Sequence, residues 1–215
     1  MEYVLEATAL TKRYRGFSAL NGLNMKIPKG AIYGFVGRNG AGKTTLIRLI
    51  CGLQEPSGGE YALYGVKNTD AGIVRSRRRM GAVVEGPSIY LDMTARENIR
   101  QQYRVLGLPS DDGIQELLQL VGLGGTGKKK ARNFSLGMRQ RLGIAQAIME
   151  NPEILLLDEP MNGMDKQGSE NIRQLILELR AEGKTIFLAS HIPQDIDILC
   201  DTVHEIDAGC LMVVR

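Results

Sequence analysis

The segment GRNGAGKTT, residues 37 to 45, limits what this chain can fold into more than any other part of the sequence. It matches the pattern GxxxxGK[ST]. An apolar strand candidate precedes it at residues 31 to 36, and apolar side chains follow it with helical spacing at residues 46 to 53. Glycines let a backbone wrap closely around an anion, so that N–H groups and the N-terminus of the next helix face phosphate oxygens. The segment therefore predicts a phosphate-binding loop, with an ordinary glycine turn as the alternative.

Two side chains of this loop bring charge and metal-binding chemistry. We expect Lys43 to neutralise charge on the β- and γ-phosphates of a nucleotide, and the Thr44 hydroxyl to bind Mg²⁺. Such a site also needs a carboxylate from a neighbouring strand end, and ILLLDEP supplies Asp158 and Glu159. Asp158 is predicted to hold the metal, and Glu159 to accept a proton from the attacking water. A simple acidic strand cap is the alternative. The candidate nucleotide-binding residues of the loop are Gly37, Arg38, Asn39, Gly40, Ala41, Gly42, Lys43, Thr44 and Thr45.

The rest of the sequence alternates between strand and helix patterns. Residues 153–160 and 184–190 are apolar runs typical of buried strands, and an amphipathic helix is expected between them at residues 170–183. Half-buried strands are expected at Val4–Leu10 and Leu20–Ile27. This alternation predicts an α/β fold with a mostly parallel sheet covered on both faces.

A helical insertion interrupts that alternation. Residues 86–150 are mostly helical in pattern, and a capping box from Thr94 to Glu97 marks the start of one helix. We expect a single domain over residues 1–215, with residues 1–85 and 151–215 as its core and residues 86–150 as a helical subdomain.

Composition excludes several classes of protein. The chain has 215 residues, of which 43% are hydrophobic and 24% charged, as expected for a globular domain with one sizeable core. A formal net charge of +3 falls short of the basic footprint that argues for nucleic acid, so no nucleic-acid partner is expected. The three cysteines form no CxxC pair, which argues against a disulfide framework or a zinc site. No apolar run approaches the roughly 20 residues that span a bilayer.

Taken in order, these motifs resemble the ATP-binding subunits of ABC transporters, and the resemblance covers nearly the whole chain. Tyr14 falls where that family stacks an aromatic ring on adenine. FSLGMRQ at residues 134–140 resembles the family's signature, NGMD at residues 162–165 resembles its D-loop, and His191 its switch histidine. A surface tyrosine and a structural histidine are the alternatives for Tyr14 and His191.

The resemblance implies a fold, a chemistry and partners. The implied fold is a P-loop NTPase core of the RecA-like type with an N-terminal antiparallel β-subdomain and an inserted α-helical subdomain. The implied cofactors are ATP and Mg²⁺, with Glu159, His191 and Lys43 as catalytic residues, and the implied partners are integral-membrane permease subunits. The resemblance also implies that two ATPase copies, or this chain and a similar one, close head to tail over ATP. The phosphate loop of one copy then faces the signature and D-loop of the other, namely Ser135, Leu136, Gly137 and Asp165.

One residue departs from the general family pattern at a functional position. The stretch AVVEGPSIY places Glu85 where the family usually has a glutamine that contacts Mg²⁺ or its water. Glutamate keeps the oxygen acceptor, loses the amide donor and adds negative charge beside Asp158 and the triphosphate. We expect Glu85 to join Thr44 and Asp158 at the metal, with a neutral replacement as the alternative. Residues 86–103 are the candidates for contact with the permease.

The Glu85 stretch and FSLGMRQRLGIA together resemble the bacitracin and lantibiotic-immunity branch of the family. That resemblance implies export or expulsion of a membrane-active peptide, with this chain cytoplasmic and peripheral on the inner face of the cell membrane. One alternative is a soluble ABC-type ATPase that acts on DNA or the ribosome. Another is a sensor that binds ATP without turnover, which the presence of Glu159 and His191 opposes.

Overall fold

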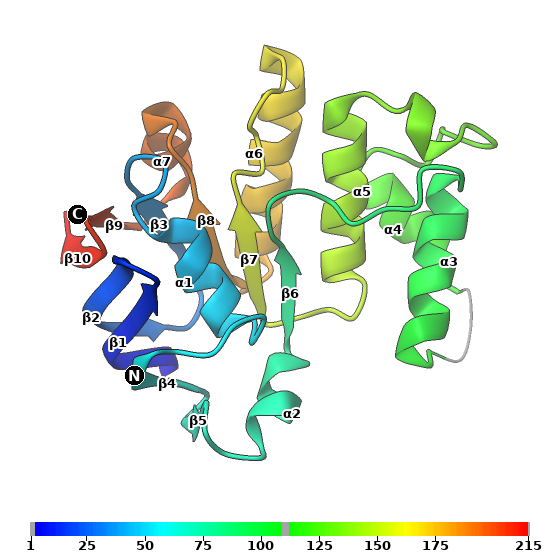
Figure 1. The fold of residues 1–215 in the computed structure, drawn as a ribbon. Coiled ribbons are helices and arrows are strands. Elements are labelled where there is room, and N and C mark those ends of the chain that lie inside the picture. The colour runs from blue at the N-terminus through cyan, green and yellow to red at the C-terminus, as the bar shows by residue number, and fades with distance from the viewer. Residues whose placement is uncertain (1–2, 109–111, 215) are drawn as a thin grey trace.

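The computed structural model describes residues 3–108 and 112–214, and it contains two sheets and a group of helices (Figure 1). The antiparallel sheet lies on one side of the molecule and α3, α4 and α5 lie together on the other. In chain order the elements are β1 (Tyr3–Tyr14), β2 (Phe17–Pro28), β3 (Ile32–Val36), α1 (Lys43–Ile50), β4 (Gly58–Leu63), β5 (Val66–Lys67), α2 (Ile73–Arg77), β6 (Met80–Val83), α3 (Ala95–Leu106), α4 (Ile114–Leu120), a 3₁₀ turn (Ala131–Asn133), α5 (Leu136–Ile148), β7 (Ile154–Asp158), α6 (Lys166–Ala181), β8 (Thr185–Ala189), α7 (Pro193–Leu199), β9 (Thr202–Asp207) and β10 (Cys210–Val213).

The larger sheet carries the functional loops at its strand ends. Its strand order is β10-β9-β3-β8-β7-β6, and all neighbouring pairs are parallel except the pair of β10 with β9. Every residue of β7 and β8 is buried, which explains why both strands are continuous apolar runs in the sequence. The prediction of a mostly parallel, covered sheet is confirmed.

The smaller sheet is antiparallel, with the order β2-β1-β4-β5. β1 and β2 continue beyond the predicted strands because their pairing extends to Tyr14 with Phe17, and the side chains of Arg13, Tyr14 and Phe17 at this end are exposed. Exposure removes the apolar alternation that marks a strand in sequence, while the backbone pairing goes on. The hairpin therefore reaches as far as Tyr14, toward the phosphate loop.

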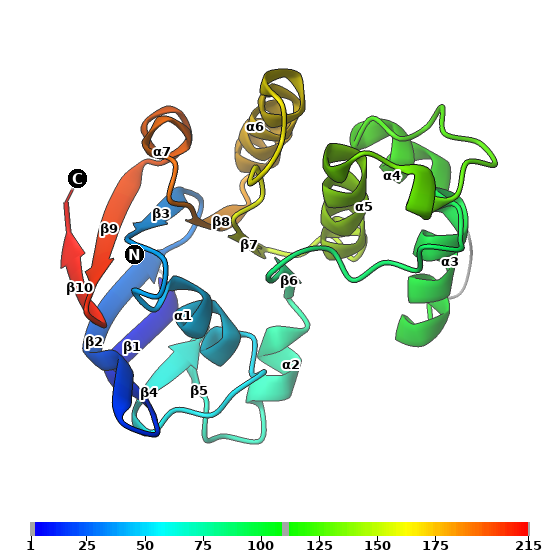
Figure 2. The same cartoon turned by 45° about the horizontal axis from the view of Figure 1, so that its top comes forward.

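Helix α1 lies between the two sheets (Figure 2). Its buried side chains Leu46, Ile47, Leu49 and Ile50 share one core with β1, β2 and the face of β7 that carries Ile154 and Leu156. A second core joins the other face of the larger sheet to α3, α4, α5 and α6. The first core holds α1, and hence the loop before it, against both sheets.

Local capping signals explain where several helices begin. The capping box at α3 is confirmed: the Thr94 hydroxyl accepts from the Glu97 N–H at 3.2 Å, and the Glu97 carboxylate accepts from the Thr94 N–H at 2.7 Å. α6 begins at Lys166 rather than at residue 170, because Asp165 caps it by accepting from the Gly168 N–H at 2.8 Å. The sequence did not predict α7, β9 and β10. All three are short, α7 and β9 have charged side chains among their apolar ones, and β10 has four residues whose side chains are mostly exposed.

Within residues 3–108 and 112–214, no helix combines the length and the apolar character needed to cross a membrane.

The larger sheet and the helical part pack closely at Gly81. A Cβ atom at this position of β6 would lie 1.9 Å from the carbonyl oxygen of Ala147 in α5. We predict that Gly81→Ala lowers the free energy of unfolding by about 1–3 kcal/mol, because the packed backbones have to move apart. Urea denaturation followed by circular dichroism measures this change.

The matched control is Gly125→Ala, since a Cβ atom there meets nothing within 4 Å. Its free energy of unfolding is expected to stay within about 0.5 kcal/mol of the parent value. Equal losses in the two variants would contradict the packing argument.

Candidate functional site

The phosphate loop joins the end of β3 to the start of α1. Gly42 caps α1 in a left-handed conformation with φ of +116°, and a Cβ atom there would lie 2.5 Å from the Ala19 carbonyl oxygen. Only glycine combines this backbone angle with so close an approach. The loop therefore leaves its N–H groups at the helix N-terminus without side-chain caps, as an anion-binding loop requires.

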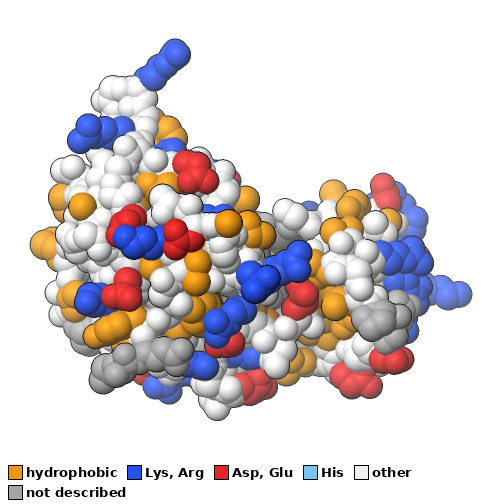
Figure 3. Space-filling view, turned by 90° about the horizontal axis from the view of Figure 1, so that it is seen from below, with side chains coloured by type: hydrophobic (Ala, Val, Ile, Leu, Met, Phe, Trp, Pro, Cys, Tyr) orange, Lys and Arg blue, Asp and Glu red, His pale blue; other side chains and the backbone are white. Residues whose placement is uncertain are grey.

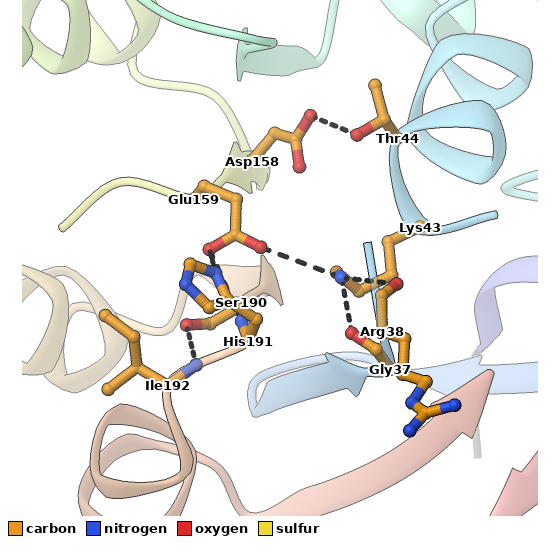
Figure 4. Close-up of polar contacts among 9 residues, drawn as sticks. All are labelled: Gly37, Arg38, Lys43, Thr44, Asp158, Glu159, Ser190, His191 and Ile192. Carbon is orange, nitrogen blue, oxygen red and sulfur yellow. Dashed lines mark hydrogen bonds and ion pairs between the residues drawn. The ribbon is translucent and has the colours of Figure 1, made fainter. Parts of the chain in front are cut away.

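Lys43 is held in place within the loop (Figure 4). Only 6% of its side chain is exposed, and its ammonium donates to the Gly37 carbonyl at 2.7 Å and to the Arg38 carbonyl at 3.4 Å. The Glu159 Oε1 atom lies 3.7 Å from the same ammonium group. The cation is thus held in position where phosphate oxygens would approach the loop.

Thr44 and Asp158 form a direct hydrogen bond across the base of the site. The Thr44 hydroxyl donates to Asp158 Oδ2 at 2.8 Å, whereas Asp158 Oδ1 is buried and has no hydrogen-bond partner among the described residues. Burial raises the pKa of Asp158 and the charge of Glu159 acts in the same direction, while hydrogen bonds from Thr44 and the Glu85 backbone lower it. A hydroxyl and a carboxylate with an unpartnered oxygen fit a hard divalent cation such as Mg²⁺.

Glu159 is positioned by His191 as well as by Lys43. Its Oε2 atom lies 2.8 Å from the His191 ring nitrogen Nδ1 and accepts from the His191 backbone N–H at 3.3 Å. Glu159 has φ of +51°, a left-handed conformation that is unfavourable for a residue with a side chain. The turn after β7 thereby directs Asp158 toward Thr44, and Glu159 toward Lys43 and His191 (Figure 4).

Tyr14 lies beside the loop, where β1 ends. A cavity of about 260 Å³ is lined by Tyr14, Phe17, Ala19, Glu159 and residues 39–45. The Tyr14 ring is 40% exposed, and its hydroxyl donates to the Gln54 side-chain oxygen at 2.5 Å. An anchored, half-exposed ring at one end and a phosphate loop at the other suit a nucleotide with its base on the ring.

The signature and D-loop residues line a different cavity of the same chain, of about 330 Å³. Ser135 caps α5 by accepting from the Met138 N–H at 3.2 Å, and the Ser135 and Leu136 side chains are exposed. Within one chain, these residues do not share the cavity of the phosphate loop. The residues that line this second cavity include Ser135, Leu136, Gly137, Gly163, Met164 and Asp165.

Glu85 has as its partner in the structure Arg48, which follows Thr44 of the Thr44–Asp158 pair in the sequence of α1. Its side chain is 60% exposed and forms an ion pair with Arg48 of α1. Glu85 was expected at the metal, and its pairing with Arg48 was not expected from the sequence. The fold explains this pair. Arg48 lies one turn beyond Thr44 on the same face of α1, and its guanidinium is there within reach of the loop that carries Glu85.

A groove begins directly after Glu85. It has a volume of about 590 Å³ and lies between α2, β6, α3 and α5. Figure 3 views the molecule from the side of α2 and shows Lys and Arg side chains beside hydrophobic ones on this face. Among the lining residues are Leu53, Val74, Arg78, Ser88, Gln102 and Leu106.

A family match accompanies this geometry. Residues 20–162 match the family model described as ABC transporter. The chain belongs to this family. It is an ABC ATPase, and it binds nucleotide as ABC ATPases do.

Curated relatives align with this ABC ATPase along almost its whole length. The bacitracin transport ATP-binding protein BcrA of Bacillus licheniformis is 43% identical over 99% of this chain and 69% of its own length. The lantibiotic transport ATP-binding protein SrtF of Streptococcus pyogenes is 37% identical over 99% of this chain and 90% of its own length. These relatives are named for transport, which lends no support to an ATPase acting on DNA or the ribosome.

Solved structures of ABC ATPases share the fold. CbiO1 from Clostridium perfringens, part of the ABC transporter complex cbiONQ, has a TM-score of 0.85 and 27% identity, covering 99% of this chain and 88% of its own. The ATP-binding cassette MJ0796, in a dimeric post-hydrolysis state with ADP and Pi, has a TM-score of 0.86 and 25% identity over 98% of this chain and 99% of its own. The expected P-loop NTPase fold, with its antiparallel β-subdomain and helical insertion, is confirmed.

Three residues at the site of the ABC ATPase were missed in the sequence. Phe17 lines the nucleotide cavity, Gln54 anchors the Tyr14 hydroxyl, and Arg48 pairs with Glu85. A usable signal existed for Arg48 alone, because a residue four positions after Thr44 shares its helix face. Nothing in the local sequence around Phe17 or Gln54 indicates that these residues approach Tyr14.

The Tyr14 ring is predicted to carry part of the nucleotide affinity. Tyr14→Ala should weaken ATP binding by about 5-fold to 100-fold, the range expected for losing one aromatic stacking partner. Equilibrium titration with a fluorescent ATP analogue measures the dissociation constant.

Tyr14→Phe is the control, because it keeps the ring and removes only the hydroxyl that binds Gln54. Its affinity should remain close to that of the parent protein. If Tyr14→Phe and Tyr14→Ala weaken ATP binding equally, the affinity depends on the hydroxyl and not on the ring.

Proposed function

We propose that this ABC ATPase uses MgATP to energise a transporter that expels a membrane-active peptide of the bacitracin or lantibiotic type. The single observation that carries the chemistry is the position of Glu159, held between the Lys43 ammonium and the His191 ring directly after Asp158. A carboxylate fixed by two neighbours beside a phosphate loop is suited to activating water. The peptide role is supported by the names and identities of the two curated relatives.

The side chains divide the hydrolysis between them. Glu159 accepts a proton from the attacking water, and His191 holds the carboxylate in the orientation that this transfer needs. Lys43 and the loop N–H groups neutralise charge on the β- and γ-phosphates. Thr44 and Asp158 would hold Mg²⁺, which when bound offsets negative charge on the phosphate oxygens. Tyr14 orients the base.

A second ATPase copy completes each site in this proposal. The exposed Ser135 and Leu136 lie away from the phosphate loop of their own chain, so they are free to face the ATP of another copy. The N-terminus of α5 directs positive potential to the same place. The dimeric state of the related cassette MJ0796 supports head-to-tail pairing. Residues 86–150 would then move as one signature subdomain relative to the core at 1–85 and 151–215.

The groove beside Glu85 is the proposed docking site for an integral-membrane permease subunit. Its exposed Leu53 and Val74 offer apolar surface, and Arg78 adds a cation at the rim. CbiO1, whose fold this chain shares, is part of a multi-subunit transporter complex. Docking there would hold the chain on the inner face of the membrane.

Glu159→Gln is predicted to abolish turnover while leaving nucleotide binding intact. The amide cannot accept the proton, so steady-state phosphate release should fall by at least about 100-fold. With MgATP the variant should also elute as a dimer in size-exclusion chromatography with light scattering, because the closed state is not released.

Glu153→Gln is the matched control, since Glu153 stands at the opposite end of β7 and pairs with Lys29 and Arg79. It should hydrolyse ATP at nearly the parent rate. Normal phosphate release from the Glu159 variant would contradict the assigned role.

Ser88→Glu tests the docking groove. A tagged copy of the chain is recovered from detergent-solubilised membranes of the native host, and bound proteins are identified by mass spectrometry. The parent chain should retain a polytopic membrane protein, and Ser88→Glu should lose it while keeping basal ATPase activity, because a new carboxylate would be buried at the interface.

Gln119→Glu is the control for that experiment, because Gln119 is exposed on α4, lies outside residues 86–103, does not line the groove, and gives the same change in charge. It should retain the membrane protein. Recovery of only soluble partners by the parent chain would overturn the transport proposal.

Host cells that carry Glu159→Gln should also become more sensitive to bacitracin or to a lantibiotic, and unchanged sensitivity to both would overturn the peptide role.

A further inference from the structure

We infer that Arg48 is the positioning residue for the Glu85 carboxylate, and that the two side chains act as a charge-matched pair that sets how strongly ATP binding depends on the metal. This inference rests on the proposed MgATP site and adds a residue that the motifs of the chain do not include.

The first support is the ion pair itself. The Arg48 guanidinium Nη2 donates to Glu85 Oε1, and the two side chains are 30% and 60% exposed. The hydrogen bond to Glu85 raises the pKa of Arg48, and the charge of Asp158 acts in the same direction. The Arg48 cation is therefore close enough to influence the carboxylate of the metal site.

The second support is the position of the pair between two functional regions. Arg48 lies one turn beyond Thr44 on α1, and the backbone of Glu85 hydrogen-bonds Asp158. On the other side, the residues that follow Glu85, namely Gly86, Pro87 and Ser88, line the docking groove. The pair thus lies between the metal site and the groove.

The third support is the backbone of the loop. Glu85 has φ of +59°, a left-handed conformation that costs a residue with a side chain about 1 kcal/mol, and Gly86 follows with φ of +129°. Backbone strain of this kind persists where surrounding contacts hold the residue in place. The ion pair with Arg48 is such a contact, and it gives the Glu85 carboxylate a partner on α1.

Charge explains why such a partner is needed. Asp158, Glu159 and a triphosphate are all negative, so a third carboxylate raises the repulsion unless a cation accompanies it. Arg48 with Glu85 is neutral as a unit. Removing Arg48 leaves a net negative charge next to the site, and removing Glu85 leaves a net positive charge there.

Two single variants should therefore shift nucleotide affinity in opposite directions. In EDTA, Arg48→Gln leaves an uncompensated carboxylate and should weaken ATP binding by about threefold, the size expected for one partly solvated charge. Glu85→Gln leaves an uncompensated guanidinium and should strengthen binding by a similar factor. The double variant should bind ATP within about twofold of the parent chain, because the charges cancel again.

Bound Mg²⁺ reverses the sign of these electrostatic effects on ATP affinity. The ratio of ATP affinity with Mg²⁺ to that without it should rise in Arg48→Gln and fall in Glu85→Gln, because a cation at Asp158 attracts a free carboxylate and repels a free guanidinium. Arg48→Lys keeps the charge and should stay near the parent ratio. Titration of a fluorescent ATP analogue into the full chain, in EDTA and in Mg²⁺, measures every value, and circular dichroism checks folding.

The control pair is Lys26 with Glu6, whose ion pair of 3.6 Å lies in the antiparallel sheet. Lys26→Gln and Glu6→Gln make the same changes in net charge and should leave the ratio unchanged. Shifts in the same direction for Arg48→Gln and Glu85→Gln, or equal shifts in the control pair, would overturn the inference. Since the assay needs neither hydrolysis nor a permease, its result is independent of whether the chain drives transport.

Discussion

The hydrogen bond between Thr44 and Asp158 is the contact on which the rest of the site depends. It joins residues 114 positions apart, one in the first turn of α1 and the other at the end of β7. Because α1 is packed between both sheets, this contact fixes the phosphate loop relative to the turn after β7. Lys43 then meets Glu159, and Glu159 meets His191 at the end of the neighbouring strand β8.

The three carboxylates named at this contact each have a hydrogen-bonded or charged partner. Asp158 accepts from Thr44, Glu159 lies between Lys43 and His191, and Glu85 pairs with Arg48. Both Glu85 and Glu159 have positive φ, so these two turns carry backbone strain. Strain at such positions is retained where surrounding contacts hold it, and here those contacts are the ones that orient the charges.

Much of the fold followed from local patterns. The strand, glycine loop and helix at residues 31–53, the buried strands β7 and β8 and the capping box of α3 are each contained in a short contiguous stretch, and the structure has them there. The ends of β1 and β2 and the elements after β8 were not predicted. In these places pairing between exposed or short segments decides the structure, and a single segment carries no strong period to indicate it.

For the candidate site, too, contiguous motifs were predictable from the sequence and contacts between distant residues were not. By itself the sequence determined which groups are present, because the phosphate loop, the Asp158–Glu159 pair and the signature are contiguous motifs whose residue types state their chemistry. Only the tertiary structure decided which groups meet. It placed Gln54 on Tyr14, and it placed Arg48 on Glu85, 37 positions away in the chain. Side-chain pairs between distant elements depend on helix rotation and strand register, which packing of the whole core sets.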